Sequence, residues 1–364
     1  IIMFNDFYTG KKILVTGHTG FKGSWLCTWL LNLGAEVTGY SIDVPSEPSL
    51  FEDLRLSEKI TDIRGDVRDL NNLKNALADQ NPDLIFHLAA QPIVRRSYDD
   101  PVETFTTNAI GSMNILEAVR ESDSVKSMVM ITSDKAYRNV EWIWGYKEDD
   151  LLGGEDPYSS SKGCAELIFY SYVNSYFKNN EKLSKLTTAR AGNVIGGGDW
   201  AKDRIVPDIV RSFSKDNTLS IRAPNATRPW QHVLEPLSGY LTLAMMQVSR
   251  TDLNHESFNF GPRDDVNQNV LRLVEEFSKY WDSGSWEVNE DNTKPEAGLL
   301  KLNCDKAHAM LDWKAILSFE ETINFTGEWY KAYFKDQVDL YEFSVKQITD
   351  YSQKAKEKGL KWAE

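Results

Sequence analysis

The chain has 364 residues, of which 41% are hydrophobic and 26% are charged, and its formal net charge is -13 at pH 7. This length suffices for one large α/β unit or two fused domains, and the composition excludes global disorder. The acidic balance argues against a nucleic-acid-binding surface, because phosphate backbones require clustered Lys and Arg. It does not exclude a small anionic substrate, which needs only a few local cations.

The cysteines and the apolar stretches bear on the cellular compartment. Cys27, Cys164 and Cys304 are scattered, odd in number and without metal-ligand spacing, so they predict neither a disulfide framework nor a metal site and fit a reducing cytosol. No stretch reaches the roughly 18 uninterrupted apolar residues of a membrane span, and the first residues lack the pattern of a secretory signal. We therefore expect a cytoplasmic protein.

Taken in chain order, short apolar strands alternate with helical patterns. The sequence predicts strands at 12–16, 36–42, 84–88, 127–131 and 187–190, and helices at 24–33, 71–77, 113–120 and 157–177. This alternation is typical of an α/β protein with a doubly wound, mostly parallel Rossmann sheet. We predict an NAD-binding domain over residues 1–189. We expect residues 190–364 to form mainly a smaller substrate-binding lobe, with some segments returning to the first domain, and the lysine-rich tail after Ser352 to be a solvated helix.

A glycine-rich turn connects the first strand to the first helix, with the sequence TGHTGFKG at 16–23. Glycine lets the backbone turn sharply and approach a diphosphate, and the unpaired N–H groups of the helix N-terminus attract the anion. The spacing G-x-x-G-x-x-G is a variant of the commoner dinucleotide fingerprint. We therefore expect NAD to bind through this turn, at Gly17, Thr19, Gly20, Phe21, Lys22 and Gly23.

Further cofactor contacts are expected near the ends of the later strands. The second strand ends near Ser41, where such folds usually carry an acid. Asp43, slightly beyond, either binds the ribose 2′-hydroxyl, which favours NAD over NADP, or is a loop carboxylate. His87, at the end of the 84–88 strand, is expected to be a buried structural histidine. The remaining expected cofactor ligands are the adenine contact Asp66 with the adjoining Val67, the run Ala89, Ala90 and Gln91, and, further along the chain, Asn108, Tyr158 and Lys162.

Tyr158 and Lys162 lie four residues apart at the start of the 157–177 helix, and therefore on one face of it. A tyrosine is a poor base at neutral pH, so a neighbouring ammonium must lower its pKa. The phenolate then takes a hydroxyl proton while hydride leaves the same carbon for a nicotinamide. A surface pair is the alternative, but the Rossmann pattern upstream favours the catalytic interpretation.

Polar residues follow the 127–131 strand, at the edge of a parallel sheet where ligands bind. Ser133 is placed to hydrogen-bond a substrate hydroxyl beside Tyr158. Asp134 and Lys135 add an acid and an amine that a simple dehydrogenase does not require. These two residues predict chemistry beyond hydride transfer, unless they serve only to cap the strand end.

Read together, these motifs resemble the extended short-chain dehydrogenase/reductase family and, within it, the branch of nucleotide-sugar 4,6-dehydratases that acts on CDP-glucose. The resemblance spans nearly the whole chain. The segments that carry it are the turn at 17–26, HLAAQPIVRRSY at 87–98, TSDKAY at 132–137, YSSSK at 158–162, RAGNVIGGGDWAKDRIVP at 190–207, RPWQHVLEPL at 228–237, SFEE at 318–321 and WY at 329–330.

The resemblance implies a three-step lyase reaction with NAD on a nucleotide-linked glucose, in a pathway to deoxysugars of bacterial lipopolysaccharide. Tyr158 assists oxidation at C4, water leaves across C5 and C6, and C6 is then reduced. By this likeness Asp134 protonates the leaving hydroxyl. Dehydratases that act on dTDP-glucose carry Glu after this Asp as the base for C5, whereas this chain has Lys135. A lysine acts as a base only if its pKa is lowered substantially, so Lys135 and Asp134 are rival candidates.

The resemblance also implies a set of substrate ligands. Asn193 corresponds to a phosphate contact and Arg228 to an arginine that clamps the diphosphate, for which a guanidinium is suited. A surface salt bridge is the alternative for Arg228. Asn108 resembles a position that supports the active-site lysine through water. The other implied substrate ligands are Arg95, Arg204 and His232.

A homodimer is implied as well, with the helices around 104–120 and 157–177 of each subunit forming a four-helix bundle. Two other functions compete. A nucleotide-sugar 4-epimerase shares the glycine turn and the Tyr–Lys pair, but members of that class have small or apolar residues in place of Asp134 and Lys135. A non-enzymatic NAD-binding subunit typically loses the tyrosine or the lysine, and both are present here. Neither nucleic acid nor a membrane is an expected partner.

Overall fold

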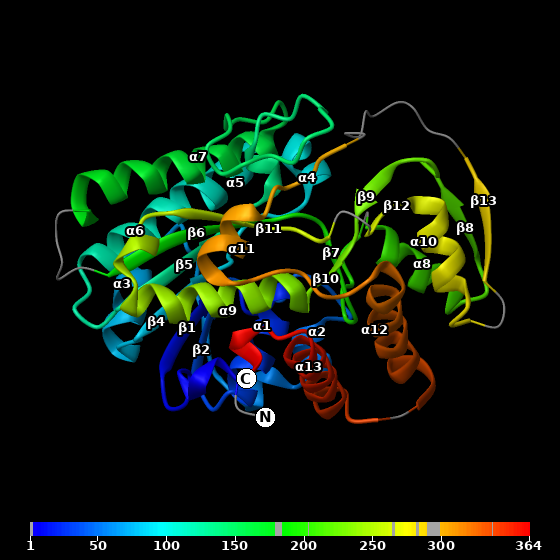
Figure 1. The fold of residues 1–364 in the computed structure, drawn as a ribbon, viewed down its shortest axis with the longest axis horizontal. Coiled ribbons are helices and arrows are strands. Elements are labelled where there is room, and N and C mark those ends of the chain that lie inside the picture. Colours follow the sequence, from blue (N-terminus) through cyan, green and yellow to red (C-terminus); the bar gives the residue numbers. More distant parts are fainter. Residues whose placement is uncertain are drawn as a thin grey trace.

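A seven-stranded sheet lies at the centre of the computed structural model, with helices on both faces (Figure 1). The structure describes residues 3–178, 184–202, 204–263, 266–281, 284–289, 299–336 and 338–364. The strand order is β11-β6-β5-β4-β1-β2-β3 and each neighbouring pair is parallel, which confirms the predicted sheet. The strands are β1 Lys12–Thr16, β2 Glu36–Ser41, β3 Thr61–Arg64, β4 Leu84–His87, β5 Ser127–Ile131, β6 Lys185–Ala191 and β11 Ser257–Phe260.

The two edge strands are the ones that the sequence did not predict. β3 (TDIR) has no apolar run and is only half-buried, and β11 (SFNF) has four residues with no clear pattern of its own, so neither gives a strong strand signal. β11 comes from the second half of the chain and pairs with β6. The division of the chain at residues 189 and 190 stays a prediction, and β6 runs across it.

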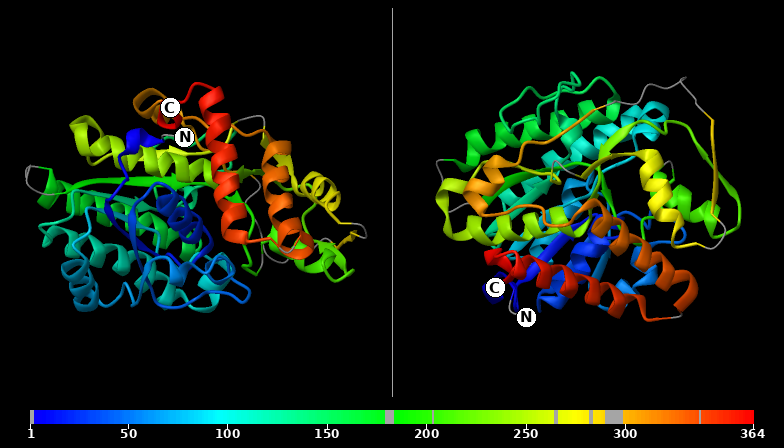
Figure 2. Two further views of the ribbon diagram at one scale, coloured as in Figure 1. Left: turned by 90° about the horizontal axis from the view of Figure 1, so that it is seen from below. Right: turned by 45° about the vertical axis from the view of Figure 1, so that its right-hand side comes forward.

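Two helical layers cover the sheet because the side chains of its strands alternate between the faces. In β1, Ile13 and Val15 join one hydrophobic core and Leu14 joins the other. Figure 2 shows the layers on opposite sides of the sheet. One layer contains α3 Leu70–Gln80, α6 Gly111–Arg120 and α7 Pro157–Tyr172, and the other contains α1 Phe21–Asn32 and α9 Leu234–Ser249.

Two of these helices differ from the sequence-based expectation. The predicted helix over 157–177 forms as α7 followed by a π-helical turn, Val173–Phe177. α9 was not predicted at all. Nearly every residue of α9 up to Ala244 is buried, so it lacks the alternation of apolar and polar faces that marks a surface helix.

The second lobe lies to the right in Figure 1, beyond the carboxyl ends of the central strands. It contains three small two-stranded sheets and several helices. The sheets are β7 Val194–Ile195 with β10 Gln231–His232, β9 Thr227–Pro229 with β12 Asn267–Asn269, and β8 Thr218–Ile221 with β13 Ser285–Val288. The helices are α8 Ile205–Phe213, α10 Val270–Ser278 and α12 Phe319–Lys331. The remaining helices of the described chain are α2 Leu50–Asp53, α4 Val94–Asp99, α5 Pro101–Phe105, α11 Asp305–Leu311 and α13 Leu340–Glu357.

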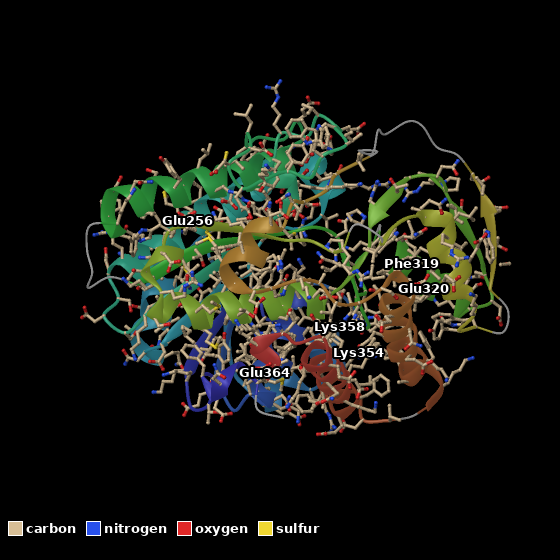
Figure 3. All side chains as sticks on the ribbon, in the orientation of Figure 1. Glu256, Phe319, Glu320, Lys354, Lys358 and Glu364 are labelled. Carbon is tan, nitrogen blue, oxygen red and sulfur yellow. The ribbon has the colours of Figure 1, made fainter. Side chains whose placement is uncertain are left out.

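The carboxyl-terminal segment matches its expectation only in part: α13 continues through Glu357, and Lys356, Glu357 and Lys358 are exposed, but other residues of the segment face the core. α13 buries Ser352 and Ala355, and the ring of Trp362 beyond it stacks on another aromatic ring of the core. Two lysines of the segment, labelled in Figure 3, make specific contacts: Lys354 lies 2.8 Å from a glutamate of α12, and Lys358, just beyond α13, donates to a backbone carbonyl. The prediction rested on lysine content alone and did not anticipate that the apolar positions between the lysines face the core. No described helix is long and apolar enough to cross a membrane.

Candidate active site

The glycine-rich turn forms a cradle that only glycine can build. Gly17 has a φ of +75°, and a Cβ there would lie 2.7 Å from the backbone nitrogen of Ala89. A Cβ on Gly23 would lie 2.1 Å from the Gly17 carbonyl oxygen. α1 begins directly after Gly20, and no side chain caps its first N–H groups. The turn therefore leaves a helix N-terminus open to an anion, as a dinucleotide diphosphate requires.

The end of β2 contains a polar cluster that the sequence did not reveal. The buried ring of His18 lies against Gly39, where a Cβ would clash with it. Its Nδ1 is 2.9 Å from the Ser41 hydroxyl and its Nε2 is 2.9 Å from the Asp62 carboxylate. Burial lowers the pKa of His18, and Asp62 opposes this shift. Asp43 is exposed. Its backbone carbonyl accepts a hydrogen bond from the Thr19 hydroxyl at 2.6 Å.

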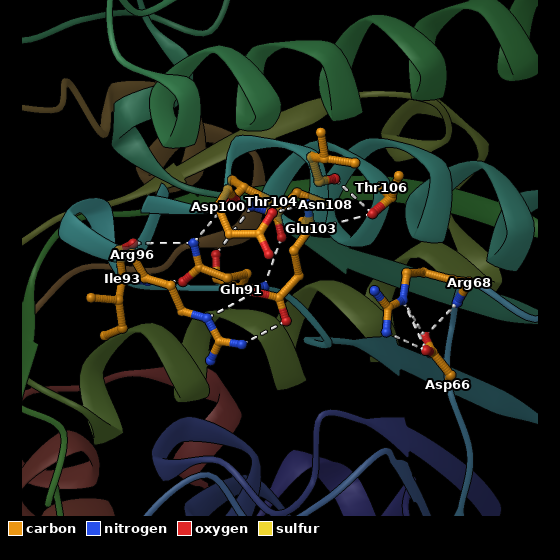
Figure 4. A network of polar contacts seen from close by, with 11 residues as sticks. Asp66, Arg68, Gln91, Ile93, Arg96, Asp100, Glu103, Thr104, Thr106 and Asn108 are labelled. Carbon is orange, nitrogen blue, oxygen red and sulfur yellow. Dashed lines mark hydrogen bonds and ion pairs between the residues drawn. The ribbon is translucent and has the colours of Figure 1, made fainter. Parts of the chain in front are cut away.

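The second expected acid, Asp66, is engaged by a neighbour. Its carboxylate forms an ion pair of 2.6 Å with Arg68 (Figure 4). Burial would raise the pKa of Asp66, but the hydrogen bonds and charge of Arg68 lower it. The backbone of Val67 is fixed by Asn114, whose amide donates to the Val67 carbonyl at 2.9 Å. The adenine contact proposed for Asp66 and Val67 stays a prediction.

The structure confirms that His87 is a buried structural histidine. It is buried at the end of β4, and its Nδ1 lies 2.8 Å from the Thr16 hydroxyl. Burial, with the nearby charge of Lys162, lowers the pKa of His87 to about 3, so the ring is neutral. The Thr16 hydroxyl in turn accepts from the backbone N–H of Ala89 at 3.2 Å, which fixes the strand end against the glycine turn.

Asn108 ties the end of β4 to the helix that carries Tyr158. It lies in a π-helical turn, Thr106–Ile110, a type of bulge that is frequent at functional sites. Its side chain accepts from the backbone N–H of Gln91 at 2.8 Å (Figure 4) and donates to the Ser161 hydroxyl at 2.8 Å. Asn108 therefore supports α7 directly next to Lys162. The predicted water-mediated contact with that lysine stays a prediction.

α7 begins where the sequence predicts, because Asp156 caps it and Pro157 occupies its first turn. Tyr158 and Lys162 are both buried on its inner face. Burial raises the pKa of Tyr158 to about 12, and a hydrogen bond with Ser133 and the charge of Arg204 oppose the shift. Burial lowers the pKa of Lys162 to about 8. Arg204, expected only as a substrate ligand, is thus a cation that favours the Tyr158 phenolate.

Asp134 follows β5, is buried, and lies close enough to Tyr158 for its charge to act on the tyrosine. It accepts from the Ser133 hydroxyl at 2.9 Å, and a Cβ on Gly192 would lie 3.2 Å from one of its oxygens. Burial raises the pKa of Asp134, while the charges of Lys135 and Lys22 act against the shift. The Lys22 side chain therefore reaches from the glycine turn toward the catalytic residues. Burial, and then the charge of Arg204, lower the pKa of Lys22 to about 8.

The expected substrate ligands are spread over the second lobe and α4. Arg204 pairs with Asp199 at 3.0 Å, and Arg228 lies on β9 and donates to the Thr227 carbonyl at 2.9 Å. Asn193 is exposed between β6 and β7, and Arg95 is half-buried on α4. The ring of His232 is instead buried in the core, in contact with two aromatic rings, and burial lowers its pKa to about 3.

The structure thus brings Ser133, Asp134, Tyr158 and Lys162 together with two cations from elsewhere, at the carboxyl edge of a Rossmann sheet. Residues 14–326 match the family model described as GDP-mannose 4,6 dehydratase. The chain belongs to that family.

Relatives of this member of the family include well-described proteins. The CDP-glucose 4,6-dehydratase of Salmonella typhimurium is 47% identical over 350 residues, covering 95% of this chain and 97% of the relative. An epimerase of Methanothermobacter thermautotrophicus, Mth375, has a similar structure, with a TM-score of 0.76 at 24% identity over 94% of this chain and 97% of that chain. The UDP-glucuronic acid 4-epimerase of Bacillus cereus, solved with UDP-glucuronic acid and NAD, has a TM-score of 0.74 at 22% identity over 89% of this chain and 100% of that chain. At these identities the two structures support the fold alone.

Proposed function

We propose that this chain is a hydro-lyase that converts CDP-glucose to CDP-4-dehydro-6-deoxyglucose with NAD. The buried acid Asp134 beside Tyr158 carries the proposal, because oxidation at C4 alone requires no second acid at the site. The 47% identity to a CDP-glucose 4,6-dehydratase over 95% of the chain supports the choice of substrate.

The cofactor would lie along the glycine turn. The cradle of Gly17 and Gly23 and the uncapped start of α1 fit a dinucleotide diphosphate, because any Cβ at either glycine would collide with backbone. Ala89 and Gln91 would face the body of the cofactor from the end of β4. When bound, NAD supplies a hydride acceptor for C4 and a hydride donor for C6.

The residues of the chain move the protons. Tyr158, with Ser133 and Arg204 favouring its phenolate, takes the proton of the C4 hydroxyl. Lys162 holds a positive charge on the same face of α7. Asp134 gives a proton to the C6 hydroxyl as it leaves, and its raised pKa suits a group that must hold a proton until that step. In one route, Lys135 takes the proton from C5 and returns it when C6 receives the hydride, with Asp134 as the acid. In the other, Asp134 starts ionised, takes the C5 proton and passes it to the leaving hydroxyl, and C5 regains a proton from solvent when C6 receives the hydride.

The test is incubation of the purified protein with CDP-glucose and NAD, followed by mass spectrometry of the sugar nucleotide. We expect loss of one water without net accumulation of NADH. An unchanged mass with inversion at C4 would replace the proposal with a 4-epimerase. No turnover of any nucleotide glucose, with NAD binding retained, would replace it with a non-enzymatic subunit.

We also propose that two copies of the chain pair through the outer faces of α5, the π-helical turn that follows it, and α7. Large apolar side chains are exposed there: Val102 is 71%, Leu167 58% and Tyr170 69% exposed. α5 and α6 both pack against α7, so the segment that contains α5 and the helix α7 present one surface. Leu167→Glu should convert the protein to a monomer in light scattering, whereas a wild-type protein that is itself monomeric would refute the pairing.

A further inference from the structure

A buried ion pair lies behind the inner face of α7 and has no part in the reaction as proposed above. Glu166 and Arg190 are 2% and 3% exposed, and the guanidinium binds the carboxylate through two bonds of 2.9 Å. Thr188 donates to the same carboxylate at 3.0 Å, and Thr132 donates to its other oxygen. Glu166 is therefore held in one position by donors from β5 and β6.

Arg190 is equally well satisfied. It donates to the Tyr137 hydroxyl and to the Glu148 carbonyl, both at 2.8 Å, and its guanidinium lies 4.9 Å from the centre of the Tyr137 ring. Burial alone would raise the pKa of Glu166, but Arg190 and the threonine hydroxyls lower it below the usual value. The carboxylate thus keeps its charge in a dry environment, where charges act strongly on one another.

The position of this charge relates it to Lys162. Tyr158, Lys162 and Glu166 follow one another at intervals of four residues, so they form one stripe along α7. Burial lowers the pKa of Lys162, and the carboxylate of Glu166 opposes that shift. Among the described residues, Glu166 is the charged group that raises the pKa of Lys162, while His87 on β4 is neutral and Lys22 on α1 is a cation.

We propose that the Glu166–Arg190 pair is a positioning device that keeps the buried Lys162 ammonium protonated at neutral pH, so that Lys162 can support the Tyr158 phenolate. Glu166 supplies the opposing charge, and Arg190 keeps Glu166 ionised and aimed along the helix. The importance of this for catalysis rests on the proposed function, but the protonation of Lys162 does not.

The test measures the titration of Lys162 itself, without substrate. The protein is trace-labelled with acetic anhydride across a pH series, and the peptide that contains Lys162 is quantified by mass spectrometry. The key variant is Glu166→Gln with Arg190→Met, which removes both charges together, because either one left unpaired in the core would endanger folding. We expect its Lys162 midpoint to fall by about one pH unit from about 8, which is about a fivefold gain in the fraction of reactive free amine at pH 7.

Two further variants keep the experiment decisive. Glu166→Asp retains the charge but withdraws it by one methylene, and should lower the midpoint by about half a unit, or about threefold in reactivity. Thr188→Val removes one hydrogen bond to Glu166 but no charge, and should leave the midpoint unchanged. If Lys162 titrates at the wild-type pH in the folded double variant or in Glu166→Asp, or if Thr188→Val shifts it as far, the proposal is wrong.

Where the wild-type protein turns over CDP-glucose, a second readout follows. The rate should decline above the Lys162 midpoint, and the double variant should show this decline at lower pH. Absence of dehydratase activity would refute the proposed function and leave the labelling result standing.

Discussion

Two buried carboxylates, Glu166 on α7 and Asp134 after β5, differ in their surroundings; we refer to the region of Glu166 as behind the Tyr158–Lys162 stripe and to the region of Asp134 as in front of it. Behind the stripe, Glu166 receives a guanidinium and two threonine hydroxyls, which lower its pKa despite burial. In front of it, Asp134 receives the Ser133 hydroxyl, the backbone N–H of Lys135 and the charges of two lysines but no guanidinium, and its pKa is raised by burial. Burial is the same in both regions, so the number and charge of the donors decide whether the acid holds its proton.

This contrast indicates that the two regions have different roles. The fully satisfied network behind the stripe holds elements together, since it joins α7 to β5 and β6. The incompletely satisfied acid in front is available to exchange a proton with a substrate. Four predictions test the contrast, from the largest effect to the smallest.

Asp134→Asn should impair dehydration by about 10²–10⁴-fold, the usual contribution of a positioned acid. The fold should remain intact, because the Asn oxygen can still accept from Ser133. NADH should accumulate, since oxidation at C4 does not need this acid. Absorbance at 340 nm and mass spectrometry of the sugar nucleotide measure the two effects, and wild-type water loss in the variant would remove Asp134 from the reaction.

Arg190→Ala should act on stability first. It leaves the Glu166 carboxylate buried without its counter-charge, which costs about 3–5 kcal/mol. Urea unfolding followed by circular dichroism gives the free energy, and Asp134→Asn serves as the matched control in the front region. A variant as stable as wild type would mean that the network behind the stripe does not hold the elements together.

Glu235 provides an intermediate case within the core. It accepts from the backbone N–H groups of Ile316 and Leu317 at 2.9 and 2.7 Å and from the Tyr351 hydroxyl at 2.7 Å, with no cation in direct contact among the described residues. Burial raises its pKa to about 7 from an ordinary value of 4.5. The folded state therefore binds this proton more tightly than the unfolded state.

The pH dependence follows with a definite sign. Stability from Glu235 is fully present below pH 4.5 and is lost as the pH rises through about 7, by up to about 3 kcal/mol. Glu235→Gln keeps the two amide contacts and can donate to Tyr351, so it should remove this loss. Urea unfolding of both proteins at several pH values compares them, and parallel curves would show that Glu235 does not titrate in this window.

Arg96→Ala should have the smallest effect. Arg96 and Glu103 form an ion pair of 2.6 Å on the surface of α4 and α5 (Figure 4), but the arginine is 59% exposed. Such pairs contribute about 0–1 kcal/mol, which thermal unfolding at low and high salt would measure. If Arg96→Ala lowered the free energy of unfolding as much as Arg190→Ala, burial would not explain the different contributions of the two ion pairs.

The sequence predicted what depends on local pattern. The apolar runs of β1 and β5, the glycine turn and the spacing of Tyr158 and Lys162 are all readable within a few residues. The contacts that finish the site were not readable in this way. Glu166 meets Arg190 across 24 residues and His18 meets Asp62 across 44, and neither pair forms a motif. The largely buried α9 lacks a periodic pattern, and the burial of His232 depends on aromatic rings from distant elements.

The placement of α9 and β11 has a consequence for engineering the substrate lobe. α9 packs over β5, where Gln247 donates to the Met128 carbonyl at 3.3 Å, and β11 completes the edge of the sheet. Both elements belong in sequence to the half that carries the lobe. A chimaera made by joining residues 1–189 to the second half of another relative would therefore exchange part of the central core along with the specificity loops. Crossover points that retain residues 234–260 of the parent should give folded chimaeras, whereas a single junction at 189 should not.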